Sequence, residues 1–211
     1  MSLSLRLREG LVGLGLELSA DMQSKLLDYL ALLKKWNRTY NLTAIRDEGE
    51  MLTQHLLDSL SMLSALQNSA LAGRRWADVG SGAGLPGIPL AIARPDLEMS
   101  LIETVEKKFA FQRQAKIELG LANITVIGQR VEALPGGQFD AVVSRAFAEL
   151  ADFVALAGHL LVQNGRLYAM KGLATEAESK RLPSAWAVVD RVQLHVPGLD
   201  AQRHLLVLER A

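Results

Sequence analysis

The residues with the clearest chemical signature form a glycine-rich stretch at positions 78–85, with the sequence Asp-Val-Gly-Ser-Gly-Ala-Gly-Leu. Gly80, Gly82 and Gly84 alternate, so no side chain stands between the backbone and a group lying over this loop. An apolar run precedes the loop, and an apolar segment with prolines near its start follows it. This order predicts a strand, a tight loop and a helix start. Loops of this kind hold the nucleoside part of a cofactor.

A carboxylate supports this interpretation. The next apolar run, residues 99–103, ends in Glu103. Its separation from Gly80 is about that at which a doubly wound fold places an acid on a ribose hydroxyl. We therefore expect Glu103 to bind a ribose. Gly82, Gly84 and Gly87 also fit the dinucleotide fingerprint, which is a weak signal alone. The alternative is that the glycines only make a tight turn between packed elements.

From Trp76 onward, strand-like and helix-like segments alternate, which predicts a parallel sheet. The segments around 192–196 and 204–209 are separated by Pro197-Gly198, with no room for a crossover helix, so they predict an antiparallel hairpin. The fold class is therefore α/β, with a Rossmann-like, mostly parallel sheet of seven strands. Such a terminal hairpin is typical of class I methyltransferases, whereas nicotinamide-binding domains continue parallel. This architecture implies S-adenosyl-L-methionine as the cofactor.

The elements before Trp76 are helical in pattern. A short helix is expected within residues 3–18, a longer amphipathic one after Ser19, and a leucine-striped one after Asp47. We expect residues 1–73 to form an N-terminal helical extension packed on a core of residues 74–211, together one compact unit.

Cations concentrate at the end of the second expected helix. The RNA-binding candidates there are Lys34, Lys35, Arg38, Asn41 and Arg46, interleaved with Trp36 and Tyr40. Cations mixed with aromatics and amides can hold phosphates and stack bases. The alternative is a solvated helix end, where Lys and Arg favour the dipole.

Composition limits the remaining choices. Lys plus Arg and Asp plus Glu both number 23, so RNA binding would need local clusters. We expect one such cluster, around a single mouth, to combine the cations of 34–46 with Arg74, Arg75, Lys107 and Lys108. The absence of cysteine excludes disulfides, thiolate metal sites and a cysteine nucleophile. We see no signal peptide and no membrane span, and expect a cytoplasmic protein, without a metal and monomeric.

Several stretches together resemble one family. They are Lys35-Trp36-Asn37 with Tyr40-Asn41-Leu42-Thr43, His55-Leu56-Leu57-Asp58-Ser59-Leu60, the glycine loop, Arg130-Val131-Glu132, Ser144-Arg145-Ala146 and Lys171-Gly172. In this order they resemble the bacterial 16S rRNA guanine-N7 methyltransferases, the RsmG or GidB family, over nearly the whole chain. The resemblance implies methyl transfer from S-adenosylmethionine to N7 of a specific guanine in 16S ribosomal RNA, presented as RNA or as the 30S particle.

The resemblance also implies site residues. Gly80 and Leu85 would line the cofactor, Val131 and Glu132 would contact its adenine side, and Arg145 would close the site. Arg145 follows the fourth strand, where it could pair with the cofactor carboxylate or an RNA phosphate, the alternative being a surface ion pair. Lys171 has a similar position at the end of the expected fifth strand, residues 165–172, and is a further RNA-binding candidate.

The chemistry expected of such a site needs no general base. Neutral guanine has a lone pair and no proton on N7, so proximity and orientation would carry the reaction, and no catalytic residue is assigned. Phe147 could stack on the base or pack in the core. His55 and Asp58, three residues apart, could form a catalytic pair, although a structural pair is more frequent.

Three alternatives differ in class. A methyltransferase acting on a small molecule or protein would keep the glycine loop and Glu103 but would not need the cationic segment. A nicotinamide oxidoreductase is disfavoured by the hairpin and by the lack of a proton donor. A non-catalytic RNA-binding assembly factor would retain the fold without turnover.

Overall fold

The computed structural model describes residues 2–66, 73–145, 147, 149–172 and 176–211. Ala146, part of the Ser-Arg-Ala motif, lies outside them. The strands are β1 Arg75–Val79, β2 Glu98–Ile102, β3 Ile124–Ile127, β4 Phe139–Ser144, β5 Leu161–Lys171, β6 Trp186–Leu194 and β7 Arg203–Arg210. They form one seven-stranded sheet in the order β3-β2-β1-β4-β5-β7-β6. β7 pairs antiparallel with both β5 and β6, and the other pairs are parallel. The predicted fold class is confirmed.

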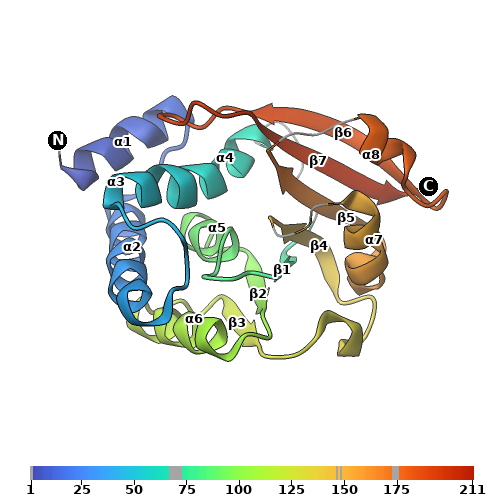
Figure 1. Cartoon of the computed structure of the whole chain (residues 1–211), viewed down its shortest axis with the longest axis horizontal. Helices are drawn as coiled ribbons and strands as arrows, with labels where there is room; N and C mark the ends of the chain where they lie inside the picture. Colours follow the sequence, from blue (N-terminus) through green and yellow to red (C-terminus); the bar gives the residue numbers. More distant parts are fainter. Residues whose placement is uncertain (1, 67–72, 146, 148, 173–175) are drawn as a thin grey trace.

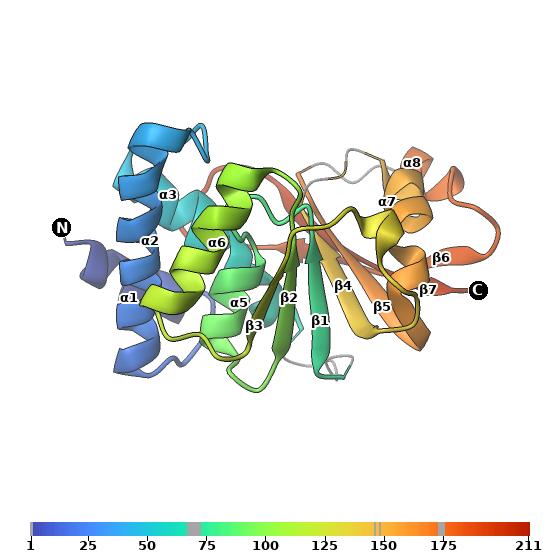
Figure 2. The same cartoon turned by 90° about the horizontal axis from the view of Figure 1, so that it is seen from below.

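The helices lie on both faces of the sheet. They are α1 Leu3–Gly13, α2 Ala20–Tyr40, α3 Glu48–Met51, α4 Asp58–Ala65, α5 Gly87–Ala93, α6 Glu106–Glu118, α7 Leu150–Ala157 and α8 Glu176–Lys180. Figures 1 and 2 show α1, α2, α5 and α6 gathered on one side of the sheet, with α7 and α8 on the other. Ser19 and Asp47 cap α2 and α3 through their side chains, as their sequence positions predict.

Alternation along the strands divides the core into two clusters. Trp76 and Leu205 belong to the cluster that α1, α2, α4, α5 and α6 complete. Their chain neighbours Ala77 and Leu206 face the cluster on the α7 side. The helices before residue 74 therefore share one apolar core with the sheet, because successive strand residues point to opposite faces.

One helical run departs from the expected pattern. The helix that begins at Glu48 passes through a π-helical segment, Leu52–Leu57, before α4. A π-helix closes its hydrogen bonds over five residues and is rare outside functional regions. His55 lies within this segment and Asp58 directly after it, so their relative direction differs from that in an ordinary α-helix.

The segment between β4 and β5 also differs from expectation. The apolar pattern of Leu150–Leu161 predicts one continuous helix. In the structure α7 ends at Ala157, and a 3-10 turn, Gly158–Leu160, leads directly into β5. β5 therefore begins at Leu161, four residues before Gly165, where the sequence pattern predicts its start. Its pairing with β4 shifts register between Phe139 and Ala141.

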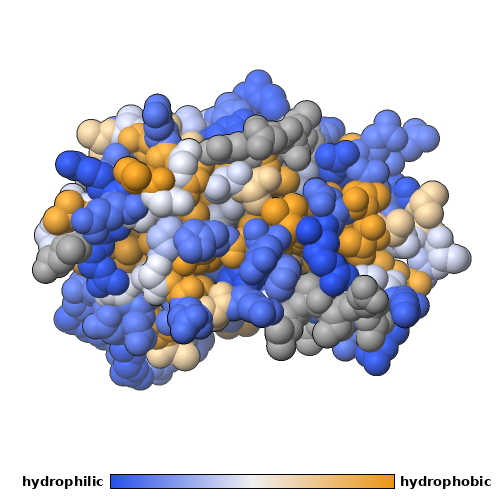
Figure 3. Space-filling view, turned by 90° about the horizontal axis from the view of Figure 1, so that it is seen from above, coloured by the Kyte–Doolittle hydropathy of each residue, from blue (hydrophilic) through white to orange (hydrophobic). Residues whose placement is uncertain are grey.

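The face seen from above in Figure 1 carries α1, α4 and the connection from β6 to β7, and hydrophilic and hydrophobic residues are interspersed over it (Figure 3). Within the described part of the chain, no helix combines the length and apolarity that crossing a bilayer requires.

Candidate functional site

The glycine loop follows β1 and has left-handed backbone angles at three glycines. φ is +67° at Gly80, +58° at Gly82 and +84° at Gly84. A Cβ at Gly82 would meet only the carbonyl oxygen of Gly80, at 3.9 Å, so this backbone faces open space. A Cβ at Gly84 would overlap Ile88 of α5. Gly82 thus fits a backbone approached by a ligand, whereas close packing alone accounts for Gly84.

Side chains from the neighbouring elements hold the loop. The carboxylate of Glu103 accepts hydrogen bonds from the amides of Gly82 at 2.9 Å and Val105 at 2.8 Å. Gln112 of α6 donates to the hydroxyl of Ser81 and to the carbonyl of Gly82, both at 2.8 Å. Each Glu103 oxygen accepts one of these bonds and keeps a further acceptor position.

A cavity of about 210 Å³ opens beside Glu103, at the carboxyl ends of β1 and β2. Four of the predicted cofactor residues line it: Gly80, Glu103, Val131 and Glu132. Val79, Ile102, Phe147 and Leu156 add apolar surface. The volume is below the roughly 300–1,000 Å³ typical of whole-ligand pockets, which fits a nucleoside portion rather than a complete cofactor.

Phe147, for which base stacking and core packing were both open, lines this cavity. Its ring stacks on Phe153 of α7 with centroids 5.0 Å apart. The ring therefore forms part of the cavity wall and of the packing behind it.

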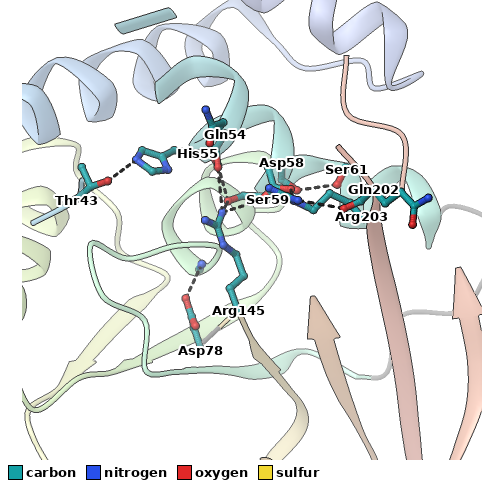
Figure 4. A network of polar contacts seen from close by, with 11 residues as sticks. Thr43, Gln54, His55, Asp58, Ser59, Ser61, Asp78, Arg145, Gln202 and Arg203 are labelled. Atoms are coloured by element: carbon teal, nitrogen blue, oxygen red, sulfur yellow. Dashed lines mark hydrogen bonds and ion pairs between the residues drawn. The ribbon is translucent and has the colours of Figure 1, made fainter. Parts of the chain in front are cut away.

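The other predicted cofactor residues lie outside the cavity lining. Gly82 and Gly84 belong to the adjoining loop. Leu85 is 9% exposed and packs in the core. Arg145 extends from the end of β4 past Asp78 to the helical extension (Figure 4).

Arg145 is held by a carboxylate of the helical extension. Its Nη1 lies 3.0 Å from Oδ2 of Asp58, which is 5% exposed, and also donates to Ser59 Oγ at 3.3 Å. The other Asp58 oxygen accepts from Nε of Arg203 at 3.1 Å. One buried carboxylate thus joins β4, α4 and β7. The alternative for Arg145 was an ion pair at the surface. Arg145 does form an ion pair, but its partner Asp58 is buried.

Arg203 was not predicted. The sequence signal that could have identified Arg203 is its position at the start of the last strand. An antiparallel strand begins on the side of the sheet where its parallel neighbours end. β7 pairs with β5 so that His204 lies opposite Lys171.

His55 and Asp58 do not form a pair. His55 Nε2 lies 3.0 Å from the hydroxyl of Thr43, while Asp58 bonds to the two arginines. Burial, assisted by the charge of Arg145, lowers the pKa of His55 to about 4, so the ring is neutral at physiological pH. Its contacts hold the loop after α2, since Thr43 also accepts from the amide of Ile45.

Asp78, at the end of β1, is the second residue that sequence reasoning did not single out. It is fully buried, and its Oδ2 accepts from the amide of Gly87 at 2.8 Å, while Oδ1 has no hydrogen-bond partner among the described residues. Burial raises the pKa of Asp78 to about 7, although the Gly87 amide and the charge of Arg145 lower it.

The cations of residues 34–46 differ in their surroundings. Lys34 pairs with Glu48 at 2.8 Å, and Arg46 donates to Oδ1 of Asn41 at 3.3 Å. Lys35 and Arg38 are exposed. Trp36 packs edge-on against Phe111 of α6, with centroids 5.7 Å apart, so it joins the end of α2 to α6.

Lys171, a separate RNA-binding candidate, and the two arginines expected at the single mouth, Arg74 and Arg75, all have partners within the protein. Lys171 forms an ion pair with Glu178, and both side chains are largely buried. Arg74 and Arg75 lie at the amino end of β1, where Arg74 donates to the Asp96 carbonyl and Arg75 pairs with Asp140 at 2.9 Å. The expectation that Arg74 and Arg75 share the mouth is wrong, because a strand's two ends lie at opposite edges of the sheet. Lys107 and Lys108, at the start of α6, do lie at the glycine-loop edge.

Comparisons with known proteins give a consistent result. A family model described as GidB, rRNA small subunit methyltransferase G, matches residues 22–206. The ribosomal RNA small subunit methyltransferase G of Aromatoleum aromaticum is 56% identical over 209 residues, 97% of each chain. The protein of the same name from Neisseria meningitidis serogroup C is 50% identical over 205 residues, again 97% of each chain.

Solved structures agree on the fold. A SAM-dependent methyltransferase from Leishmania major superposes with a TM-score of 0.61 at 18% identity, covering 86% of this chain and 83% of that one. TrmN from Thermus thermophilus gives a TM-score of 0.58 at 20% identity over 76% of this chain, which spans 53% of the TrmN chain. TYW2 from M. jannaschii, solved with AdoMet, gives 0.52 at 13% identity, covering 73% and 77%.

Proposed function

The chain belongs to the GidB family of rRNA small subunit methyltransferases G, and from this premise we propose that it transfers the methyl group of S-adenosylmethionine to N7 of a specific guanine in 16S ribosomal RNA. The observation that carries the proposal is the cavity uniting Gly80, Glu103, Val131 and Glu132 at the carboxyl ends of β1 and β2. Ligands of open α/β sheets bind at this edge.

The residues present fit the cofactor. Glu103 has free acceptor positions for ribose hydroxyls, and the apolar cavity walls suit an adenine ring. Of the adjoining loop residues, we propose that Gly82 is the backbone that the cofactor approaches, with Gly84 and Leu85 packed behind it. We place Arg145 at the far end of the site. The cofactor supplies a methyl group on a sulfonium centre. These assignments are proposals about this chain.

The protein's contribution is to hold an exposed guanine in line with that methyl group. Attack by the N7 lone pair removes no proton, so the proposed reaction needs no general base. The product guanine gains positive charge. Arg145 is paired with Asp58, so its charge is balanced within the protein and opposes this development less.

For RNA we propose a surface made of Lys35, Arg38, Arg46, Lys107 and Lys108. They belong to the end of α2, the loop after it and the start of α6, which Trp36 and Phe111 hold together. Lys34, Asn41 and Lys171 remain candidates. In this structure Lys34 and Lys171 each pair with a glutamate, and Asn41 accepts a hydrogen bond from Arg46 of the proposed surface. Their engagement with RNA would require exchange of those contacts.

We propose naked 16S RNA or the 30S particle as the form in which the substrate is bound. We further propose that the protein acts as a monomer in the cytoplasm, without a metal and away from membranes. Residues 1–73 are proposed as an extension built onto the methyltransferase core of residues 74–211, since the two share one apolar cluster.

Methyl transfer from labelled S-adenosylmethionine tests the proposal. Small-subunit RNA and 30S particles lacking the modification serve as substrates, and the product nucleoside is identified. We expect 7-methylguanosine at one site. Cofactor binding without transfer to either substrate would favour a small-molecule or protein methyltransferase, and absence of cofactor binding would favour a non-catalytic RNA-binding factor.

A further inference from the structure

Tyr29 connects the helical extension to the glycine loop. It lies in the middle of α2 and is fully buried. Its hydroxyl donates a hydrogen bond of 2.7 Å to the carbonyl oxygen of Ala83, 54 residues further along the chain. A residue outside the Rossmann-like core therefore touches the backbone of the loop that we assign to the cofactor.

The bond acts on one particular peptide group. The carbonyl of Ala83 accepts from Tyr29, and the amide on the other side of the same peptide, that of Gly84, donates to the Ser81 carbonyl at 2.7 Å. The peptide is thus held at both ends. Its neighbours Gly82 and Gly84 both have positive φ, a region in which glycine rotates freely, so the loop sequence alone does not fix this orientation.

The surroundings keep the hydroxyl in place as a donor. The Tyr29 ring lies 6.1 Å from that of Phe111 in α6, and the next residue, Gln112, holds the neighbouring Gly82 carbonyl. Burial raises the pKa of Tyr29 well above its ordinary value, so the hydroxyl keeps its proton; the charge of Arg145 lowers this pKa and that of Asp78 raises it, both by less.

We propose that Tyr29 is a positioning residue for methyl-donor binding: its hydroxyl sets the Ala83–Gly84 peptide, and with it the open backbone at Gly82. The inference rests on the proposed function, because it takes the glycine loop as the cofactor loop. It makes α2 a structural part of the cofactor site as well as a carrier of cations.

Tyr29→Phe removes this single hydroxyl and keeps the ring. Titration calorimetry with S-adenosylmethionine is expected to show binding about five- to tenfold weaker than in the wild type, the range for loss of one buried hydrogen bond. In the methyl-transfer assay, KM for the cofactor should rise by a similar factor, while kcat at saturating cofactor and KM for RNA stay within about twofold.

The matched control is Thr53→Val. It also removes a buried hydroxyl bonded to a backbone carbonyl, that of Gly49 at 3.1 Å, but away from the glycine loop. It should lower thermal stability about as much as Tyr29→Phe and leave cofactor affinity unchanged.

Three results would overturn the inference: wild-type affinity in Tyr29→Phe, equal loss of affinity in both variants, or global unfolding of Tyr29→Phe. A wild-type protein that does not bind the cofactor would instead contradict the proposed function, so the two failures are distinguishable in one experiment.

Discussion

The two ends of the parallel strands differ in how their charged groups are paired. The side of the sheet at which these strands begin is called here the amino edge, and the side at which they end the carboxyl edge. At the amino edge, Asp96 pairs with Arg94 at 2.6 Å and Asp140 with Arg75 at 2.9 Å, and the arginines lower the pKa of both carboxylates. At the carboxyl edge, Asp78 is buried and its pKa is raised, while Asp58 lies buried between two arginines.

The energetically unfavourable arrangement lies at the carboxyl edge. The amino edge satisfies its charges with exposed partners, as a structural surface does. The carboxyl edge buries ionisable groups and leaves one Asp78 oxygen without a partner among the described residues, which is typical of ligand sites. Substitutions at matched positions on the two edges test this difference.

The largest effect is expected for the pH dependence of Asp78. Its folded pKa, about 7, exceeds its unfolded value near 4, so the folded state binds the proton more tightly and this contribution to stability is lost as pH rises from about 4 to 7. His55, with a folded pKa of about 4, contributes in the opposite direction between pH 4 and 6.5. As pH rises through this window, the free energy of unfolding of Asp78→Asn should therefore increase relative to that of the wild type, by at most about 4 kcal/mol.

Urea unfolding at several pH values between 4.5 and 8 measures this difference. Asp96→Asn is the control at the amino edge, because Arg94 lowers the pKa of Asp96 and its contribution is lost only below about pH 4. The quantity compared is the free energy of unfolding of the wild type and of Asp78→Asn. If the difference between them does not change with pH, Asp78 stays ionised in the folded protein.

The next effect concerns the shared carboxylate. Asp58→Asn leaves two guanidinium groups, each about a quarter exposed, without a counter-charge. We expect a loss of about 3 kcal/mol in the free energy of unfolding, the lower part of the range for a broken buried pair. Asp96→Asn should cost less than about 1 kcal/mol, as exposed pairs do. Equal losses at the two edges would remove the basis of the comparison.

Substitution of Glu103 by glutamine should weaken cofactor binding by about tenfold. Glu103→Gln keeps one acceptor oxygen but directs an amide NH₂ at the backbone N–H of Gly82 or Val105, which costs about one hydrogen bond plus desolvation. Calorimetry with S-adenosylmethionine measures the loss. The control is Glu106→Gln in the exposed first turn of α6, which should bind as the wild type does.

The smallest effect is expected for RNA. Arg38→Ala should weaken binding of a small-subunit RNA fragment by a few-fold and reduce the slope of log affinity against log salt by about one. Arg74→Ala, at the amino edge, should change neither quantity. If Arg38→Ala and Arg74→Ala have the same RNA affinity and the same salt dependence, the proposed RNA-binding surface at the carboxyl edge is wrong.

The strands and the glycine loop could be predicted from sequence because local pattern determines them. Apolar runs end in turns, and the carboxylate of Glu103 follows its strand directly. The path of β5 was less predictable, since Leu150–Leu161 reads as one apolar helix while the chain leaves it at Ala157 to pair with β4.

The polar network could not be predicted, because its members are distant in sequence. Arg203 meets Asp58 over 145 positions, and Arg145 meets Ser59 over 86. Lys171 appeared available for RNA because its partner, Glu178, lies in a different element. In the sequence, Tyr29 stands at helical spacing between Leu26 and Leu33 and reads only as one member of an apolar stripe. Its hydroxyl bond to Ala83 has no local signature.

The π-helical segment Leu52–Leu57 makes this network sensitive to chain length rather than to composition. One residue more or fewer in a helix turns everything that follows by about 100°. A deletion within this segment that restored an ordinary α-helix would keep every apolar residue type yet rotate Asp58 away from Arg145 and Arg203. During divergence, insertions and deletions in this largely buried stretch should therefore be rarer than exchanges of one apolar side chain for another.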